Sequence, residues 1–163
     1  MIALALGANL PSWAGPPPAT LRAALTALEQ RGVRVACLSP FYRTPAWPDP
    51  REPEFVNAVA TIETKLSPAE LLQTLQQTET RFGRERSARN APRTLDLDIL
   101  DYDGRVEQGP PILPHPRMTA RAFVLVPLAD VAPDWRHPAT GETISQLLAA
   151  LSEEERAAVK RIR

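Results

Sequence analysis

The chain has 163 residues, of which 44% are hydrophobic and 23% charged, and its 19 basic and 19 acidic side chains give a formal net charge of zero. This length suits one domain, residues 1–163, and is too short for two domains of ordinary size. A neutral chain has no global field that would draw it to nucleic acid or to an anionic membrane, and no apolar run approaches the length of a membrane span.

The compartment is expected to be the cytoplasm. The apolar start 1-MIALALGANL-10 lacks the basic residues of a signal peptide. The single cysteine, Cys37, lies in the apolar run 33-VRVACL-38 and is expected to be a small buried hydrophobe in a reducing environment. We expect a monomer, with a weak homodimer as the alternative.

The first half of the chain predicts a strand, a helix and two further strands. Residues 2–7 are expected to form a short buried strand, and a helix with one apolar stripe runs to about Gln30. Residues 33–44 predict a second strand, and residues 55–64 predict a third with apolar residues at alternate positions. Between them, residues 45–54 hold four prolines, which excludes a central strand and predicts a loop.

The next helix has a strong start signal. Ser67 is a typical N-cap, Pro68 suits the first turn, and Glu70 completes a capping box. The helix is expected to end near Gly83. Glu79 lies on its inward stripe, where an acid is costly unless it is paired. Two roles stay open for Glu79: a boundary residue that reaches water, or a carboxylate that pairs with an arginine or a ligand.

The remaining elements complete an α+β pattern. An arginine-rich loop is followed by a strand at 94–100, an apolar run at 123–133 and a helix from about Thr143. The order strand, helix, strand, strand, helix, strand predicts a ferredoxin-like antiparallel sheet with helices packed on one face. The other face is then free for a ligand, and we expect the active site there.

Two aspartates lie within the strand 94-TLDLDIL-100, although strands usually disfavour this residue. Because side chains alternate along a strand, Asp96 and Asp98 point to the open face while the apolar residues point to the helices. Carboxylates two residues apart are separated by about 7 Å. That spacing suits one or two hard cations whose other ligands are water and phosphate oxygens. The pair alone leaves open a simpler reading, in which both charges keep an exposed face soluble.

Basic segments flank the aspartates on both sides. Guanidinium groups beside a divalent-cation site supply bidentate contacts to phosphate oxygens, so a triphosphate is the expected ligand. A histidine held in an extended loop before a proline is expected to donate to phosphate as well. A solvated basic loop is the alternative reading of the arginines alone. The flanking basic residues are Arg84, Arg86, Arg89, Arg93, His115, Arg117 and Arg121.

Four segments together, 43-RTPAW-47, 55-FVNAV-59, 92-PRTLDLDIL-100 and 114-PHPRMTARAFVLVPLADVAP-133, form a specific combination. It resembles the 6-hydroxymethyl-7,8-dihydropterin pyrophosphokinase family. The start 7-GANL-10 is also similar to the family's G-S-N-L, and the resemblance runs from about residue 2 to residue 150. It implies a ferredoxin-like enzyme of folate biosynthesis that moves a pyrophosphoryl group from ATP to the pterin's hydroxymethyl oxygen and releases AMP.

The same resemblance implies roles for individual residues. Asp96 and Asp98 would hold two Mg²⁺ ions that bridge the ATP phosphates. The pterin would stack between Phe55 and Phe123, each of which is expected to be the first residue of a strand. The expected catalytic residues are Arg84, Arg93, Asp96 and Asp98. The residues expected to bind ATP are Arg84, Arg86, Arg93, His115 and Arg121. The residues expected to contact the pterin are Gly7, Thr44, Pro45, Trp47, Phe55, Asn57 and Phe123.

Some features depart from the family or leave alternatives open. The loop between Gly83 and Pro92 looks about one residue shorter than in some relatives and has Asn90 where some carry a tryptophan, so the role of Arg89 stays open. A metal-dependent nucleotidyltransferase or cyclase on the same fold would release pyrophosphate where the pyrophosphokinase releases AMP. An RNA-binding module is disfavoured, because a strand bearing two aspartates repels phosphate unless a metal is bound.

Overall fold

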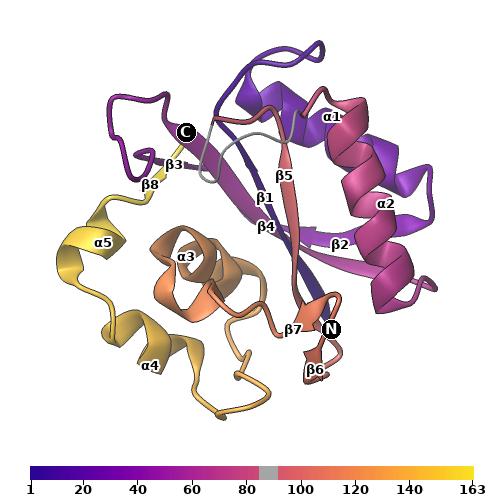
Figure 1. Ribbon diagram of the computed structural model, residues 1–163. Coiled ribbons are helices and arrows are strands. Elements are labelled where there is room, and N and C mark those ends of the chain that lie inside the picture. The colour runs from indigo at the N-terminus through magenta and orange to yellow at the C-terminus, as the bar shows by residue number, and fades with distance from the viewer. Residues whose placement is uncertain (85–91) are drawn as a thin grey trace.

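The computed structural model describes residues 1–84 and 92–163, and its antiparallel sheet lies between two layers of helices (Figure 1). The first elements are β1 (Ile2–Ala8), α1 (Pro17–Glu29), β2 (Val33–Leu38), β3 (Tyr42–Thr44), β4 (Phe55–Thr64), α2 (Pro68–Arg81) and β5 (Asp96–Tyr102). The later elements are β6 (Glu107–Gln108), β7 (Ile112–Leu113), η1 (Met118–Ala120), α3 (Ala122–Val131), α4 (Ile144–Ala149), α5 (Glu153–Ala157) and β8 (Lys160–Arg161).

The sheet confirms the predicted fold class. Its strand order is β5-β1-β4-β3-β8, with β2 also paired to β4, and α1 and α2 cover one face (Figure 1). The single strand expected at 33–44 is in fact two strands, β2 and β3. Pro40 lies between them, and proline has no N–H to give to the ladder. In the described part of the chain, no helix combines the length and apolarity needed to cross a bilayer.

The face beneath α1 and α2 carries the main hydrophobic core. Alternate residues of two neighbouring strands, Leu4 and Leu6 of β1 with Leu97 and Ile99 of β5, are buried there. Each fully buried leucine contributes about 2 kcal/mol through the apolar surface removed from water. This burial fixes the face to which each strand residue points, so Asp96 and Asp98 must point the other way.

The start of α2 is as predicted and determines where its inward residues fall. The Ser67 hydroxyl accepts from the Glu70 N–H, and the Glu70 carboxylate accepts from the Ser67 N–H. Glu79 follows eleven residues after Pro68, three turns later, and is 4% exposed. The capping box thus fixes the helical phase that brings this acid to the sheet.

The opposite face is partly covered, which corrects the expectation that it would be free. Helix α3 packs on β4, and a second core forms around Val59, Leu100 and Leu125 (Figure 1). The expectation that Phe123 opens a strand is wrong, because Phe123 lies in the first turn of α3. A continuous apolar run cannot be divided by period into buried strand and buried helix. This helix contacts α4 and α5 as well as β4, so its apolar residues are covered on more than one side.

A bulge in β5 extends the contact with this second layer. Ala3 pairs with Asp101 and Leu4 with Ile99, so Leu100 is an extra residue. Leu100 therefore enters the second core, and the next residue, Asp101, accepts a hydrogen bond from the Trp135 indole at 2.7 Å. On the same side, the Tyr42 hydroxyl of β3 donates to Asp130 of α3, which joins this helix to the sheet.

The expectation that Cys37 is buried is wrong, because its side chain is exposed. A register shift between Val35 and Cys37 interrupts the alternation of β2 against β4. Only Val33 and Val35 of this strand contact the main core. The apolar run of β2 therefore continues past the part of the strand that the helices cover.

Candidate active site

One row across the sheet brings together residues from four strands. Asp96 of β5 pairs with Gly7 of β1, Gly7 pairs with Asn57 of β4, and Asn57 pairs with Tyr42 of β3. Directly paired residues of antiparallel strands place their side chains on the same face. The row therefore sets a carboxylate and an amide on the face opposite α1 and α2, two strands apart.

Gly7 lies between them because the space above it is taken. A Cβ at this position would lie 2.7 Å from the Asn57 Oδ1 atom, closer than atoms in contact allow. The Asn57 Nδ2 donates to the Thr44 Oγ1 at 2.8 Å, and both residues are buried. The Asn57 amide is thus held by its hydrogen bond to Thr44, and the lack of a side chain at Gly7 leaves room for it.

Arg84 reaches the site through the way in which α2 ends. Gly83 adopts a φ of 84°, a left-handed conformation that glycine takes without steric cost. The Arg84 N–H then donates to the Glu79 carbonyl, and the Gly83 N–H donates to the Thr80 carbonyl, which is a Schellman motif. This turn directs the arginine side chain back toward β5.

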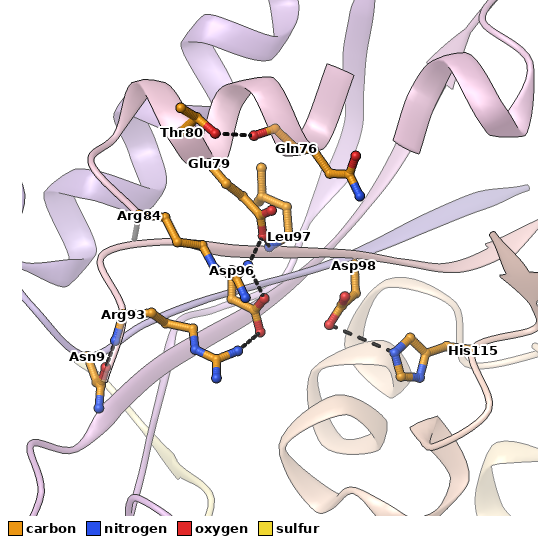
Figure 2. A network of polar contacts seen from close by, with 10 residues as sticks. All are labelled: Asn9, Gln76, Glu79, Thr80, Arg84, Arg93, Asp96, Leu97, Asp98 and His115. Carbon is orange, nitrogen blue, oxygen red and sulfur yellow. Dashed lines mark hydrogen bonds and ion pairs between the residues drawn. The ribbon is translucent and has the colours of Figure 1, made fainter. Parts of the chain in front are cut away.

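Two arginines hold Asp96 (Figure 2). The Arg84 Nη1 lies 2.9 Å from the Asp96 Oδ1, and the Arg93 Nη1 lies 3.3 Å from its Oδ2. Arg84 also pairs with Glu79. All of these side chains are less than a third exposed, so water screens their charges only weakly. Protein carboxylates therefore hold both guanidinium groups beside Asp96.

Glu79 takes the second of its two open roles, as a carboxylate that pairs near the site. Besides Arg84, it accepts a hydrogen bond from the Leu97 N–H at 2.8 Å. Burial raises the pKa of Glu79 to about 7, although this N–H and the Arg84 charge oppose the rise. Glu79 thus joins the end of α2 to the strand that carries both aspartates.

We expect Glu79→Gln to change the pH dependence of stability. The folded pKa of Glu79 is raised from 4.5 to about 7, so the folded protein holds this proton more tightly than the unfolded chain. The resulting stability is fully present below pH 4.5 and is lost as pH rises through 7. Urea unfolding at several pH values should show the wild type losing stability against Glu79→Gln across this range. Parallel curves for the two proteins would contradict the assignment.

Asp98 has different neighbours from Asp96 (Figure 2). Burial raises the pKa of Asp98 to about 6, the nearby Asp96 charge adds to the rise, and Arg121 opposes it. The His115 Nε2 lies 3.9 Å from the Asp98 Oδ2. A carboxylate whose ionised form is costly to keep is well suited to a cation, which would stabilise its charge.

The loop before α3 brings His115 to this place as a neutral donor. The His115 N–H donates to the Leu100 carbonyl at 2.9 Å, which fastens the loop to β5. Burial lowers the pKa of His115 to about 4, and the Arg121 and Arg117 charges lower it further. Because its Nδ1 accepts from the Arg117 N–H at 3.1 Å, the ring proton lies on Nε2, on the side of Asp98.

Arg121 completes the basic surroundings. It is the N-cap residue of α3, and its guanidinium carbon lies 5.5 Å from the centre of the Phe123 ring. Arg84 and Arg93 thus lie against Asp96, whereas His115 lies near Asp98 and the Arg121 charge acts on it. Arg86 and Arg89 lie outside the described residues.

Of the residues predicted to contact a pterin, Gly7 pairs with Asn57 in the sheet and Thr44 bonds to its side chain. Phe55 opens β4 as expected, is half-buried and pairs with Thr44. Pro45 and Trp47 follow β3 in the loop, and both are exposed, Trp47 by 73%. Phe123 is half-buried and lies at the start of α3, in the helical layer on the other face of the sheet from α1 and α2.

The donor set near the aspartates fits a hard cation. Asp96 and Asp98 offer carboxylate oxygens, the ligands that Mg²⁺ prefers. Over residues 1–84 and 92–163, no group of three or more His, Cys, Asp or Glu side chains is arranged to hold a metal ion. A cation here would therefore take two protein ligands and complete its shell with water or phosphate oxygens.

Asn9 is a site residue to which the sequence analysis assigned no role. It follows β1, is 3% exposed, and its side chain bonds to Pro53 and Arg93. An asparagine just after a strand is an ordinary turn signal. Its partners are 44 and 84 residues away, so no local pattern could identify them.

Comparisons with known proteins agree on one family. The model of the 7,8-dihydro-6-hydroxymethylpterin-pyrophosphokinase (HPPK) family matches residues 3–133. A Synechocystis protein named 2-amino-4-hydroxy-6-hydroxymethyldihydropteridine pyrophosphokinase is 45% identical over 145 residues, which cover 88% of this chain and 72% of the relative. A Pseudomonas aeruginosa protein of the same name is 44% identical over 149 residues, which cover 90% of this chain and 89% of the relative.

Solved structures share the fold. Plasmodium falciparum HPPK-DHPS A437G/K540E with pterin and p-hydroxybenzoate superposes with a TM-score of 0.72 over 99% of this chain and 47% of that chain, at 14% identity. Wild-type Plasmodium falciparum HPPK-DHPS gives a TM-score of 0.66 over 91% of this chain and 44% of that chain, also at 14% identity. The chain thus spans less than half the length of these solved proteins.

Proposed function

This chain belongs to the 7,8-dihydro-6-hydroxymethylpterin-pyrophosphokinase family, and we propose that it transfers a pyrophosphoryl group from ATP to 6-hydroxymethyl-7,8-dihydropterin in folate biosynthesis. The pterin hydroxyl oxygen bonds to the β-phosphorus and its proton is released to water. The bond between that phosphorus and the α,β-bridging oxygen breaks, and AMP and the pterin diphosphate leave. The observation that carries the proposal is the row from Asp96 through Gly7 to Asn57. It sets a carboxylate and arginine cluster beside a buried amide on one face.

We also propose that residues 1–163 form one domain and that the protein acts as a monomer in the cytoplasm, in line with the size and neutral charge of this chain. Asp96 and Asp98 are the residues that would hold Mg²⁺, two ions in this proposal. When bound, Mg²⁺ supplies positive charge that draws the phosphates to a strand face which would otherwise repel them. The oxygen donors of this pair and the raised pKa of Asp98 support the assignment.

The triphosphate is bound by the basic residues on both sides of the aspartates. Arg84 and Arg93 are already held by carboxylates, so little reorganisation accompanies the growth of charge on the phosphates. His115 donates from Nε2 as a neutral ring, and Arg121 adds charge from the start of α3. Arg86 joins them by its place in the sequence motif.

The pterin lies at the Asn57 end. Asn57 and Thr44 read the polar edge of the ring, and Phe55 and Phe123 stack on its two faces. A flat heterocycle needs aromatic surfaces for dispersion and a few fixed polar partners for orientation. The backbone at Gly7 and the loop residues Pro45 and Trp47 complete the pocket.

Replacing Gly7 by alanine tests this pocket. The new Cβ would lie 2.7 Å from the Asn57 Oδ1, so the amide must move and its bond to Thr44 is lost. We expect pterin affinity, measured by calorimetric titration, to fall about tenfold, the worth of one displaced hydrogen bond. Gly104→Asn is the control, because a Cβ there meets nothing within 4 Å and asparagine tolerates its φ of 71°. Equal pterin affinity in Gly7→Ala and in the wild type would show that Asn57 does not contact the pterin.

The reaction itself is tested by its nucleotide product. The protein is incubated with ATP, Mg²⁺ and 6-hydroxymethyl-7,8-dihydropterin, and the nucleotides are separated by chromatography. AMP that forms only when the pterin is present is the expected result. ADP would indicate an ordinary kinase, and released pyrophosphate would indicate the nucleotidyl transfer of the alternative enzyme class.

A further inference from the structure

Asn9 joins two segments that are distant in the sequence. Its Nδ2 donates to the Pro53 carbonyl at 3.1 Å, and its Oδ1 accepts from the Arg93 N–H at 2.8 Å. The N–H groups of Asn9 and Leu10 both donate to the Arg93 carbonyl, at 3.1 and 3.2 Å. With 3% of its surface exposed, the Asn9 side chain has almost no access to water as a replacement partner.

The two partners belong to opposite ends of the site. Pro53 lies near the end of the loop 45–54, two residues before Phe55 at the pterin end. The Arg93 side chain pairs with Asp96 at the phosphate end. The buried Asn9 amide therefore joins the backbone segment at the pterin end to the backbone segment at the phosphate end. The division into these two ends rests on the proposed function.

Asparagine is suited to this position by its chemistry. One partner is a carbonyl that needs a donor, and the other is an N–H that needs an acceptor, which also fixes the orientation of the amide. Aspartate has the same shape and keeps an acceptor for Arg93, but its oxygens cannot donate to Pro53 when ionised. Alanine removes both bonds.

We propose that Asn9 is a positioning residue that couples the binding of the two substrates. A bound pterin fixes the loop that contains Pro53, and the Asn9 amide transmits this restraint to the backbone of Arg93. The Arg93 guanidinium is then better placed for the triphosphate. Coupling of this kind is reciprocal, so a bound triphosphate must favour the pterin by the same factor.

The test compares pterin affinity with and without a saturating non-hydrolysable ATP analogue, α,β-methylene-ATP with Mg²⁺, by calorimetric titration. We expect the analogue to tighten pterin binding about tenfold in the wild type, a usual size for coupling between sites. In Asn9→Asp and Asn9→Ala this factor should fall to about one, which is the loss of that coupling. Ser12→Ala is the matched control, because Ser12 follows Asn9 in the same loop and its side chain bonds to Thr20 of α1 and to Ala14, not to either partner of Asn9. Its coupling factor should stay unchanged.

Several outcomes would overturn the inference. Variants that weaken both substrates equally and keep the coupling factor would give Asn9 a merely structural role. A wild type that binds both ligands without coupling would reject this inference alone, whereas a wild type that binds no pterin would reject the proposed function with it.

A measurement on the unaltered protein decides the matter if the variants do not fold. Pterin alone should slow hydrogen exchange at the Arg93 amide, whose N–H is donated to Asn9, and leave the Thr26 amide in α1 unchanged. Exchange at Arg93 that is the same with and without pterin would overturn the proposal.

Discussion

Replacing Asp98 by asparagine should lower kcat about a thousandfold, and Asp96→Asn should do the same, because a metal-bound phosphate site contributes several kcal/mol of charge stabilisation to the transition state. Asparagine keeps the shape of the side chain and one oxygen but loses the negative charge that holds a cation. Pterin affinity measured without nucleotide should change little, since Asn57 lies two strands from β5 and its partner Thr44 lies three strands away.

Steady-state rates of AMP formation over a range of Mg²⁺ concentrations provide the measurement. Asp103→Asn is the matched control: it makes the same chemical change just after β5, at an exposed residue whose φ of 53° suits asparagine. It should keep nearly full activity. Wild-type rates in Asp98→Asn at every Mg²⁺ concentration would remove this carboxylate from the metal site.

Replacing Arg84 by methionine should destabilise the fold by about 3 kcal/mol well above pH 7, where Glu79 is ionised, because removing one partner of a buried ion pair leaves the other charge uncompensated. Arg84 pairs with both Glu79 and Asp96, and the Glu79 side chain is only 6% exposed. Methionine retains much of the apolar packing of the arginine stem, so the loss reports mainly on charge. The unfolding free energy is measured in urea.

A second change separates charge from packing in this prediction. The double variant Arg84→Met with Glu79→Gln leaves no buried charge in the pair and should recover part of the lost stability. Arg34→Met is the surface control, because its partner Glu63 and Arg34 itself are 62% and 64% exposed and such pairs contribute less than about 1 kcal/mol. If Arg84→Met were as stable as Arg34→Met, the ion pairs of Arg84 with Glu79 and Asp96 would contribute nothing measurable to the unfolding free energy.

Local periodicity was enough to predict how the aspartates are presented. The side on which Asp96 and Asp98 lie depends only on the alternation along one strand. The buried Leu97 between them and the buried Ile99 after them confirm it. The inward position of Glu79 likewise follows from a helix start fixed by Ser67 and from the helical period. These features belong to short segments of chain, so neighbouring residues determine them.

Other parts of the site depend on partners that the local sequence does not contain. The run 123–133 is apolar throughout, so its period could not separate a helix from a strand, and Phe123 was placed in the wrong kind of element. The extra residue Leu100 arises from pairing with β1, and the exposure of Cys37 from pairing with β4. Asn9 has both of its side-chain partners far along the chain.

The central place of Gly7 limits how the protein can change in length. Gly7 pairs with Asp96 on one side and with Asn57 on the other, so three strands meet in one register. Inserting or deleting one residue in any of them near this row would turn its side chains to the opposite face and separate the two halves of the site. The loop 45–54 has no such restriction, since doubling a loop's length costs only about 0.6 kcal/mol. We therefore expect relatives of this protein to differ by insertions and deletions in the loops, but only by substitutions in these three strands near the row.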